Sequence, residues 1–199
     1  MFEVAGGEML GVKSKFNRFI WIIFLFPWTA DLQAKTDAQS KLRSAKIDSI
    51  IIHAVGGPYC KQGKLAYSYA QGNAGFWKRF FEAQPVVGIH YIVDREGVVV
   101  SSISESKVAN HALGWNARSI GVELVNAGDG LDKYSSSQIL SLVLLVKDIR
   151  SRNSLIIDAN VVRHSDLDKR VFSCAGVKVK RKQDPGVLFD FKVFKQAIK

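Results

Sequence analysis

The run IDSIIIHA, residues 47–54, sets the strongest constraint on the fold. Its β-branched and apolar residues are typical of a strand that is buried inside a sheet. The glycines and proline of GGP, residues 56–58, then end this strand. His53 is therefore expected at the end of a strand, beside a glycine loop.

Three further segments have the composition of strands. Residues 88–103 predict a hairpin whose four-residue turn ends in glycine. Residues 119–126 predict a strand in which Glu123 stands inside an otherwise apolar run. Residues 160–166 predict a last strand with His164 at its end.

Helical patterns occur between and after these strands. Residues 75–83 carry aromatic side chains at helical spacing, which predicts a short amphipathic helix whose aromatic stripe faces the core. Ser135 and Gln138 have the spacing of a capping box at the start of a helix over residues 136–150, and a short helix is expected over residues 191–198. Strands mixed with helices predict an α/β (α+β) fold, with a mixed central β-sheet flanked by helices.

The start of the chain has the pattern of a secretory signal peptide. Lys13, Lys15 and Arg18 precede the apolar run FIWIIFLFPW, residues 19–28, and small residues follow it. The run is short for a membrane span, which needs about 20 residues. We therefore expect cleavage after Ala34 and a periplasmic or secreted protein. An uncleaved anchor, associated with the membrane through the same run, is the alternative.

The sequence thus divides into a signal peptide or anchor over residues 1–34, a polar linker over residues 35–46 and one domain over residues 47–199. The apolar content of 47% is enough for a full core in a domain of this size. A start of translation at Met9 is an alternative, because two glutamates precede it and acidic residues are unusual at the front of a signal peptide.

The formal net charge of +10 favours an anionic partner, such as a cell-wall polymer, a membrane face or a nucleic acid. Export argues against nucleic acid, and the sequence contains no stacking motif or recognition-helix pattern. We therefore predict no nucleic-acid partner. The sequence makes no prediction of oligomeric state.

Two histidines and one carboxylate form a candidate metal set. His53 and His164 are both expected at strand ends, and Asp184 stands in KQDPG, residues 182–186, where the proline favours extended backbone at the residue before it. In extended backbone Lys182 projects from the same face as Asp184. Two imidazoles and a carboxylate suit a catalytic zinc. On this pattern alone, structural histidines and a salt-bridged surface turn are alternatives.

Six motifs occur in an order that resembles a known family: IIIHA, GIHYIVDREG, VANHALG, SIGVELVN, RHSD and KQDPG. Together they span nearly all of residues 47–191, and they resemble the zinc-dependent N-acetylmuramoyl-L-alanine amidases. That family includes bacterial anhydro-muropeptide amidases, phage T7 lysozyme and animal peptidoglycan recognition proteins. The resemblance implies a mixed sheet flanked by helices, a zinc cofactor in a shallow groove, and hydrolysis of the amide between N-acetylmuramic acid and L-alanine in peptidoglycan or muropeptides.

The resemblance also implies roles for individual residues. His53 and His164 match the two imidazole ligands of the zinc, and Asp184 matches the carboxylate ligand. Lys182 matches the lysine that stabilises negative charge two positions before that ligand. Glu123 matches the general base of the anhydro-muropeptide branch.

Other positions are compared with the family in the same way. The phage branch uses a tyrosine as its base where this chain has Ile89, which adds weight to the glutamate. His111 resembles a position that lines the groove, so it is expected to contact substrate, and a structural histidine is the alternative. Asn110 and Asn126 are candidates for binding the sugar or the peptide, without a family position to support them. His90 is expected beneath the site or in the core.

The two cysteines, Cys60 and Cys174, allow either a disulfide or two free thiols. Cys60 follows the His53 loop and Cys174 lies in the loop after His164. If both histidines approach one zinc, these loops lie near the site, so we predict a disulfide between the two cysteines. Cys174 lies in a long insertion over residues 168–180, and some relatives use a cysteine as third ligand. We expect Asp184 in that role, because lysine and proline flank it as in the motif.

Three functions are therefore weighed. The first is an exported zinc amidase that acts on peptidoglycan. The second is a module of the same fold that binds muropeptides without cutting them, which conflicts with the retention of all three ligand positions. The third is an amidase exported as an antibacterial toxin.

Overall fold

The computed structural model describes residues 41–199. The predicted signal peptide or anchor, its cleavage after Ala34, the start at Met9 and the first part of the linker lie outside these residues. Within residues 41–199, no helix has both the length and the apolar character needed to cross a bilayer.

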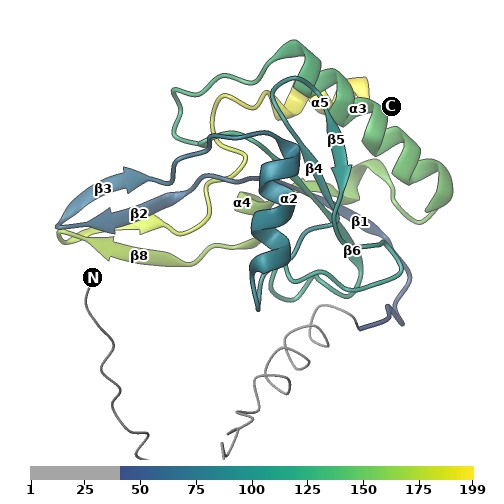
Figure 1. Ribbon diagram of the computed structural model, residues 1–199, viewed down its shortest axis with the longest axis horizontal. Coiled ribbons are helices and arrows are strands. Elements are labelled where there is room, and N and C mark those ends of the chain that lie inside the picture. Colours follow the sequence, from purple (N-terminus) through teal and green to yellow (C-terminus); the bar gives the residue numbers. More distant parts are fainter. Residues whose placement is uncertain (1–40) are drawn as a thin grey trace, which may run out of the picture.

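A five-stranded mixed sheet forms the centre of the molecule (Figure 1). Its spatial order is β5–β4–β6–β1–β7, in which only β5 pairs antiparallel with its neighbour. The strands are β1 (Ser49–Ala54), β4 (Tyr91–Val93), β5 (Val99–Ser101), β6 (Ser119–Leu124) and β7 (Val161–Arg163). Every residue of β1 and β6 is buried, because parallel strands in the middle of a sheet are covered on both faces.

Helices cover both faces of this sheet, which confirms the predicted fold class (Figure 1). On one face, α3 (Ser136–Arg152) and α5 (Phe191–Ala197) form the larger core cluster with β1, β6 and β7. On the other face, α2 (Ala74–Ala83) packs Trp77 against β4 and the ends of neighbouring segments. The two clusters leave the carboxyl ends of β1 and β6 open to a groove, where ligands commonly bind in α/β sheets.

Ser135 caps α3 as the sequence predicts, because its Oγ accepts a hydrogen bond from the N–H of Gln138 at 3.0 Å. Gln138 is used differently from the glutamine of a capping box. Its Nε2 donates to the carbonyl oxygens of Val93 and Val125. The side chain therefore fixes the start of α3 onto the ends of two strands.

Two short hairpins that were absent from our sequence analysis project from one end of the sheet (Figure 1). The first joins β2 (Pro58–Lys61) to β3 (Lys64–Tyr67), and the second joins β8 (Val171–Cys174) to β9 (Val177–Lys180). The second hairpin accounts for most of the insertion. We call residues 58–67 and 171–180 together the hairpin arm.

The two hairpins of the arm are cross-linked. Cys60 and Cys174 form a disulfide whose Cα atoms are 5.4 Å apart. The turns also touch, since a Cβ added to Gly63 would lie 3.9 Å from the Cβ of Ala175. Each hairpin turns through two residues with positive φ, the second of them glycine, as type I′ turns require.

Residues 41–46, which we predicted to belong to a linker, are attached to the domain. Arg43 pairs its backbone N–H with the carbonyl of Ser106. Its guanidinium donates to the carbonyl oxygens of Glu105, Lys107 and Asn116, at 2.9 to 3.1 Å. Five N–H donors in a fixed fork suit such a set of carbonyls. The domain therefore begins earlier than residue 47.

The last strand is shorter than predicted. β7 ends at Arg163, and His164 begins the short helix α4 (His164–Leu167). A strand assignment through residue 166 was therefore wrong, although the histidine does follow the strand directly.

Candidate metal centre and active-site groove

Three separate elements bring His53, His164 and Asp184 together at the carboxyl end of the sheet. His53 is the fifth residue of β1, and His164 is the first residue of α4. Asp184 lies in a turn closed by the hydrogen bond from the N–H of Gly186 to the carbonyl of Gln183, and its own carbonyl accepts from the N–H of Ser165. The backbone of α4 thus holds the carboxylate beside the histidine.

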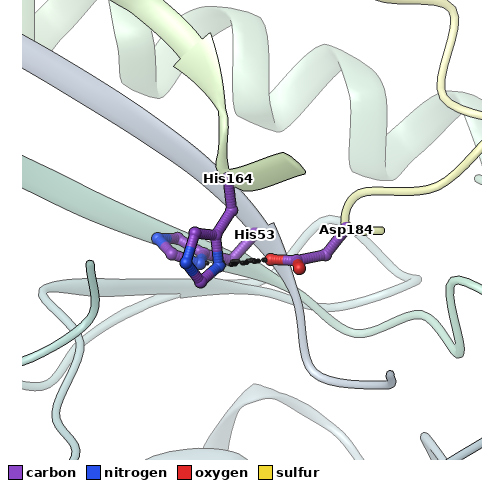
Figure 2. Close-up of side chains that lie close together, drawn as sticks. All are labelled: His53, His164 and Asp184. Carbon is purple, nitrogen blue, oxygen red and sulfur yellow. Dashed lines mark hydrogen bonds and ion pairs between the residues drawn. The ribbon is translucent and has the colours of Figure 1, made fainter. Parts of the chain in front are cut away.

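The three side chains converge on one point (Figure 2). Oδ2 of Asp184 lies 2.9 Å from Nδ1 of His164 and 3.3 Å from Nδ1 of His53. All three residues are buried. Two ligands of a tetrahedral zinc, each at about 2.0–2.1 Å from the ion, are about 3.3 Å apart. The donor types and their separations therefore fit zinc.

Burial sets the charges of this cluster. Burial lowers the pKa of His53 to about 4, so the ring is neutral at pH 7 and can offer a lone pair. Burial alone would raise the pKa of Asp184, but the hydrogen bond from His164 holds it well below its usual range. A neutral imidazole and an ionised carboxylate are the forms that bind a metal.

A chain of hydrogen bonds fixes the tautomer of His53. Ser119 Oγ donates its single proton to the carbonyl of Trp115 at 2.7 Å, so it can only accept from Nε2 of His111 at 3.2 Å. His111 Nδ1 is then an acceptor, and it lies 3.0 Å from Nε2 of His53. His53 therefore carries its proton on Nε2 and has a free lone pair on Nδ1.

This tautomer is a second argument for a cation. The lone pair of His53 Nδ1 faces a carboxylate oxygen of Asp184 at 3.3 Å, without a proton between them. Two facing lone pairs at that distance repel each other, and a positive ion bound to both would remove the repulsion. A metal-ligating histidine usually donates its other ring N–H to a polar partner, which here is His111.

Gly121 makes room for this chain. A Cβ at that position would lie 2.6 Å from Nδ1 of His111 and 2.5 Å from the side chain of Ile89, closer than real contacts allow. The glycine of the SIGVELVN motif is thus needed for the ring of His111 to lie over β6. We missed its role in the sequence, where an isolated glycine inside a strand pattern is the signal for such a close approach.

Glu123 and Lys182 lie beside the cluster. Glu123 is the register partner of His53 on the neighbouring strand, and its side chain lines the same groove. Burial raises the pKa of Glu123 to about 8, with the charge of Asp184 acting in the same direction. Lys182 is half-buried and lines the groove from the segment that carries Asp184.

The groove has a volume of about 550 Å³, and His53, Asp184 and Glu123 line it. His164 lines a separate pocket with Leu167 and Asp168. One wall is apolar, and it consists of Trp77, Phe80 and Phe81 of α2 together with Val87. We predicted that the aromatic stripe belongs to the core, but the stripe has two roles. Trp77 is 8% exposed and packs inward, whereas Phe80 is 42% exposed.

The other predicted site residues differ in their placement. His111 and Asn110 line the groove. Asn126 is buried and is absent from the groove lining. Its Nδ2 donates to the carbonyl of Asp132, and its Oδ1 accepts from the N–H of Gly128, so the side chain holds a loop. His90 is fully buried and accepts from the backbone of Gly121, beneath His111.

Cys174 cannot be the third ligand in this structure, because its sulfur is in the disulfide with Cys60. Asp184 takes the position in the cluster. Tyr67 on β3 donates to Oε1 of Gln183 at 3.0 Å, and Tyr134 donates to the carbonyl of Pro185 at 2.5 Å. These two bonds hold the turn of Asp184 from both sides.

The model of the family described as N-acetylmuramoyl-L-alanine amidase matches residues 43–187, which contain all of these groups. The chain belongs to this family. The match begins at Arg43, in agreement with the attachment of that residue to the domain. The resemblance inferred from the six motifs is thereby confirmed.

Two curated phage proteins are similar over part of the chain. The endolysin of Escherichia phage T7 and that of Enterobacteria phage T3 are each 41% identical over 51 residues, which are 26% of this chain and 34% of the endolysin. The chain thus matches about a third of the length of these curated relatives.

Solved structures share the fold. The amidase AmiD from E. coli, in complex with anhydro-N-acetylmuramic acid-L-Ala-D-γ-Glu-L-Lys, has a TM-score of 0.57 and 23% identity, and the match covers 79% of this chain and 60% of AmiD. AmpDh3 from Pseudomonas aeruginosa, in complex with anhydromuramic pentapeptide, has a TM-score of 0.56 and 22% identity, with 77% and 60% covered.

Proposed function

We propose that this protein is a zinc-dependent N-acetylmuramoyl-L-alanine amidase, which hydrolyses the amide between N-acetylmuramic acid and L-alanine in peptidoglycan or muropeptides. The observation that carries the proposal is the buried set of His53, His164 and Asp184, two of which line a groove that also presents Glu123 and Lys182. Membership of the amidase family supports it.

His53, His164 and Asp184 would hold the zinc, and Nδ1 of His53 would face it. Bound there, zinc supplies a Lewis acid that brings the pKa of a water toward neutrality and polarises the scissile carbonyl. The remaining steps belong to the side chains of the groove.

Glu123 would act as general base and then as general acid. It would take a proton from the attacking water as the new C–O bond forms and the carbonyl π electrons move onto the oxygen. It would then give that proton to the nitrogen of the leaving L-alanine as the C–N bond breaks and the carbonyl re-forms. A carboxyl group whose pKa burial raises to about 8 can both accept and donate a proton near neutral pH. Its position beside His53 on the adjacent strand supports this role.

Lys182 would stabilise the negative charge that grows on the carbonyl oxygen as water attacks. The aromatic wall of α2 gives the substrate an apolar surface, and Asn110 and His111 offer polar groups on the floor. The substrate proposed here has the chemistry of the AmiD ligand, a muramic acid joined to L-Ala-D-γ-Glu-L-Lys.

The proposal is tested by mass spectrometry of products from a purified muropeptide of that structure, with and without a zinc chelator. We expect free L-Ala-D-γ-Glu-L-Lys from the wild type, loss of turnover with chelator, and recovery after zinc is added. Glu96→Gln, a change at an exposed glutamate, is the matched control for Glu123→Gln.

The alternative of a binding module makes the opposite prediction. Retention of the intact muropeptide by the zinc-loaded wild type, with no free peptide even at long times, would establish binding without cleavage. An antibacterial role would instead be recognised by lysis of target cells that receive the exported protein.

We also propose that the protein is exported to the periplasm or beyond, on the basis of the basic and apolar pattern of residues 13–34. The disulfide between Cys60 and Cys174 supports this, because disulfides persist in oxidising compartments. N-terminal sequencing of protein from fractionated cells tests it. A chain beginning after Ala34 in the periplasm is expected, and recovery of the chain from the cytosol would contradict the proposal.

A further inference from the structure

The hairpin arm carries positive charge without counter-charge. Residues 58–67 and 171–180 contain four lysines and no aspartate or glutamate. These arm lysines are Lys61, Lys64, Lys178 and Lys180. None of their ammonium groups forms a hydrogen bond or ion pair with the described part of the chain. An ordinary solvated surface mixes both signs, so this surface is set apart by its composition.

Two lysines of the hairpin arm also lie where their charges repel each other. Lys61 and Lys64 are direct partners in the register of the first hairpin. Like charges directly opposite each other destabilise a strand pair. Nothing in the described residues neutralises this pair, whereas an anion bound between the two ammonium groups would turn the repulsion into attraction.

The strand alternation places the lysines on the outer sides of the arm. The disulfide joins Cys60 to Cys174, so the faces that carry these cysteines are turned toward each other. Lys61 and Lys64 occupy the opposite face of the first hairpin, and Lys178 and Lys180 occupy the opposite face of the second. Val179, which shares the inner face, is 8% exposed. Positive charge therefore projects from both outer faces.

The arm begins at the rim of the groove. Pro58, the first residue of β2, lines the groove, and so do Arg181 and Lys182, which directly follow β9. A four-residue strand spans about 13 Å. A substrate longer than the unit being cleaved would therefore pass along the arm after leaving the groove.

We propose that the hairpin arm binds the polymeric form of the substrate through the carboxylates of peptide stems that neighbour the one being cleaved. A stem that contains a γ-linked D-glutamate has a free α-carboxylate on that residue and another at its C-terminus, and such stems recur along the glycan. Lysines on both outer faces suit a polymer mesh that surrounds the arm, whereas a flat membrane would contact one face. This inference rests on the proposed function.

The test compares a polymeric and a soluble substrate. The arm variant carries Lys61→Gln, Lys64→Gln, Lys178→Gln and Lys180→Gln. The control variant carries four lysine-to-glutamine changes at exposed positions outside the arm: Lys133, Lys147, Lys192 and Lys199. Both variants lose the same charge. Sedimentation with purified insoluble peptidoglycan measures binding, and turnover is measured on the same material and on the soluble muropeptide.

We expect the arm variant to bind insoluble peptidoglycan roughly 10-fold more weakly than wild type at low salt, since each exposed ion pair is worth a factor of about two. Added salt should reduce the difference. Turnover of the soluble muropeptide should be unchanged in the arm variant, and the control variant should resemble wild type in both assays.

Two results would overturn the inference. One is equal loss of binding in the arm and control variants, which would indicate net charge alone. The other is wild-type binding of the arm variant to peptidoglycan together with lost binding to vesicles of phosphatidylglycerol and phosphatidylcholine, which would assign the arm to a membrane. Turnover of the soluble muropeptide by the wild type tests the proposed function separately, because that substrate has no neighbouring stems.

Discussion

Removal of the Cys60–Cys174 disulfide should destabilise the protein by an amount that follows from its position in the chain. The two cysteines are 114 residues apart, and the cross-link closes most of the sheet into one loop. In the chain-entropy model, a loop of that length restricts the unfolded state by about 5 kcal/mol. The double variant Cys60→Ala/Cys174→Ala is expected to lose free energy of unfolding of this order.

Urea denaturation followed by circular dichroism measures the change. With a slope of about 2 kcal/mol per molar urea, the midpoint should fall by about 2.5 M. Wild-type protein treated with a reductant should unfold near the variant, and the variant itself should not respond to the reductant. Zinc content should be unchanged, because none of the three ligands lies on the hairpin arm.

The reasoning fails if the variant loses less than about 1 kcal/mol and reductant leaves the wild type unaffected. That outcome would mean that the unfolded chain is not restricted by the cross-link. A smaller loss of free energy of unfolding, together with a shallow transition that precedes the main one, would instead show that the hairpin arm unfolds before the sheet.

Three further predictions concern the site. Glu123→Gln should keep zinc, as measured by elemental analysis, and lose roughly 10²- to 10⁴-fold in turnover, the range for a positioned proton-transfer group; full turnover with zinc bound would leave the base to another group. Ser119→Ala should weaken zinc binding about 10- to 100-fold in a chelator competition. The substitution removes the hydroxyl that accepts from His111, and His111 in turn fixes the tautomer of His53. Unchanged zinc affinity would show that the tautomer of His53 is set in another way. The metal-free protein should lose stability as the pH falls from about 6.5 to 4, because burial lowers the pKa of His90 from 6.5 to about 4 and the unfolded state binds the proton first. That shift is worth roughly 3 kcal/mol, and urea unfolding across this pH range should show a shallower decline in His90→Gln.

The sequence was sufficient to predict the elements whose stability comes from local burial. The run IDSIIIHA became a fully buried strand, and Ser135 caps the long helix, because apolar content and a side-chain cap are visible residue by residue. The three proposed ligands could also be predicted, because His53 lies near the end of a strand, His164 directly follows one and Asp184 stands beside a proline.

What could not be predicted depends on distant partners. The strands of the hairpin arm are four residues each, with exposed lysines in the alternation, so they lack the contrast of a half-buried strand. The attachment of Arg43 to the domain could not be predicted, because the carbonyls that accept its hydrogen bonds are more than 60 residues away in the sequence. Asn126 was a candidate for binding the sugar or the peptide, but its side chain is buried and bonds Asp132 and Gly128 of a nearby loop.

The pairing of His53 with Glu123 across adjacent strands has a consequence for how this enzyme can diversify. Neighbouring strands are held about 4.8 Å apart by backbone hydrogen bonds, whatever their side chains. The separation of the proposed metal ligand and the proposed base is therefore set by the sheet, and it is insensitive to the length of the loops around the groove. Insertions such as the second hairpin can be gained, exchanged or lost by descendants of this gene. Such changes would alter what the protein binds without moving His53 relative to Glu123.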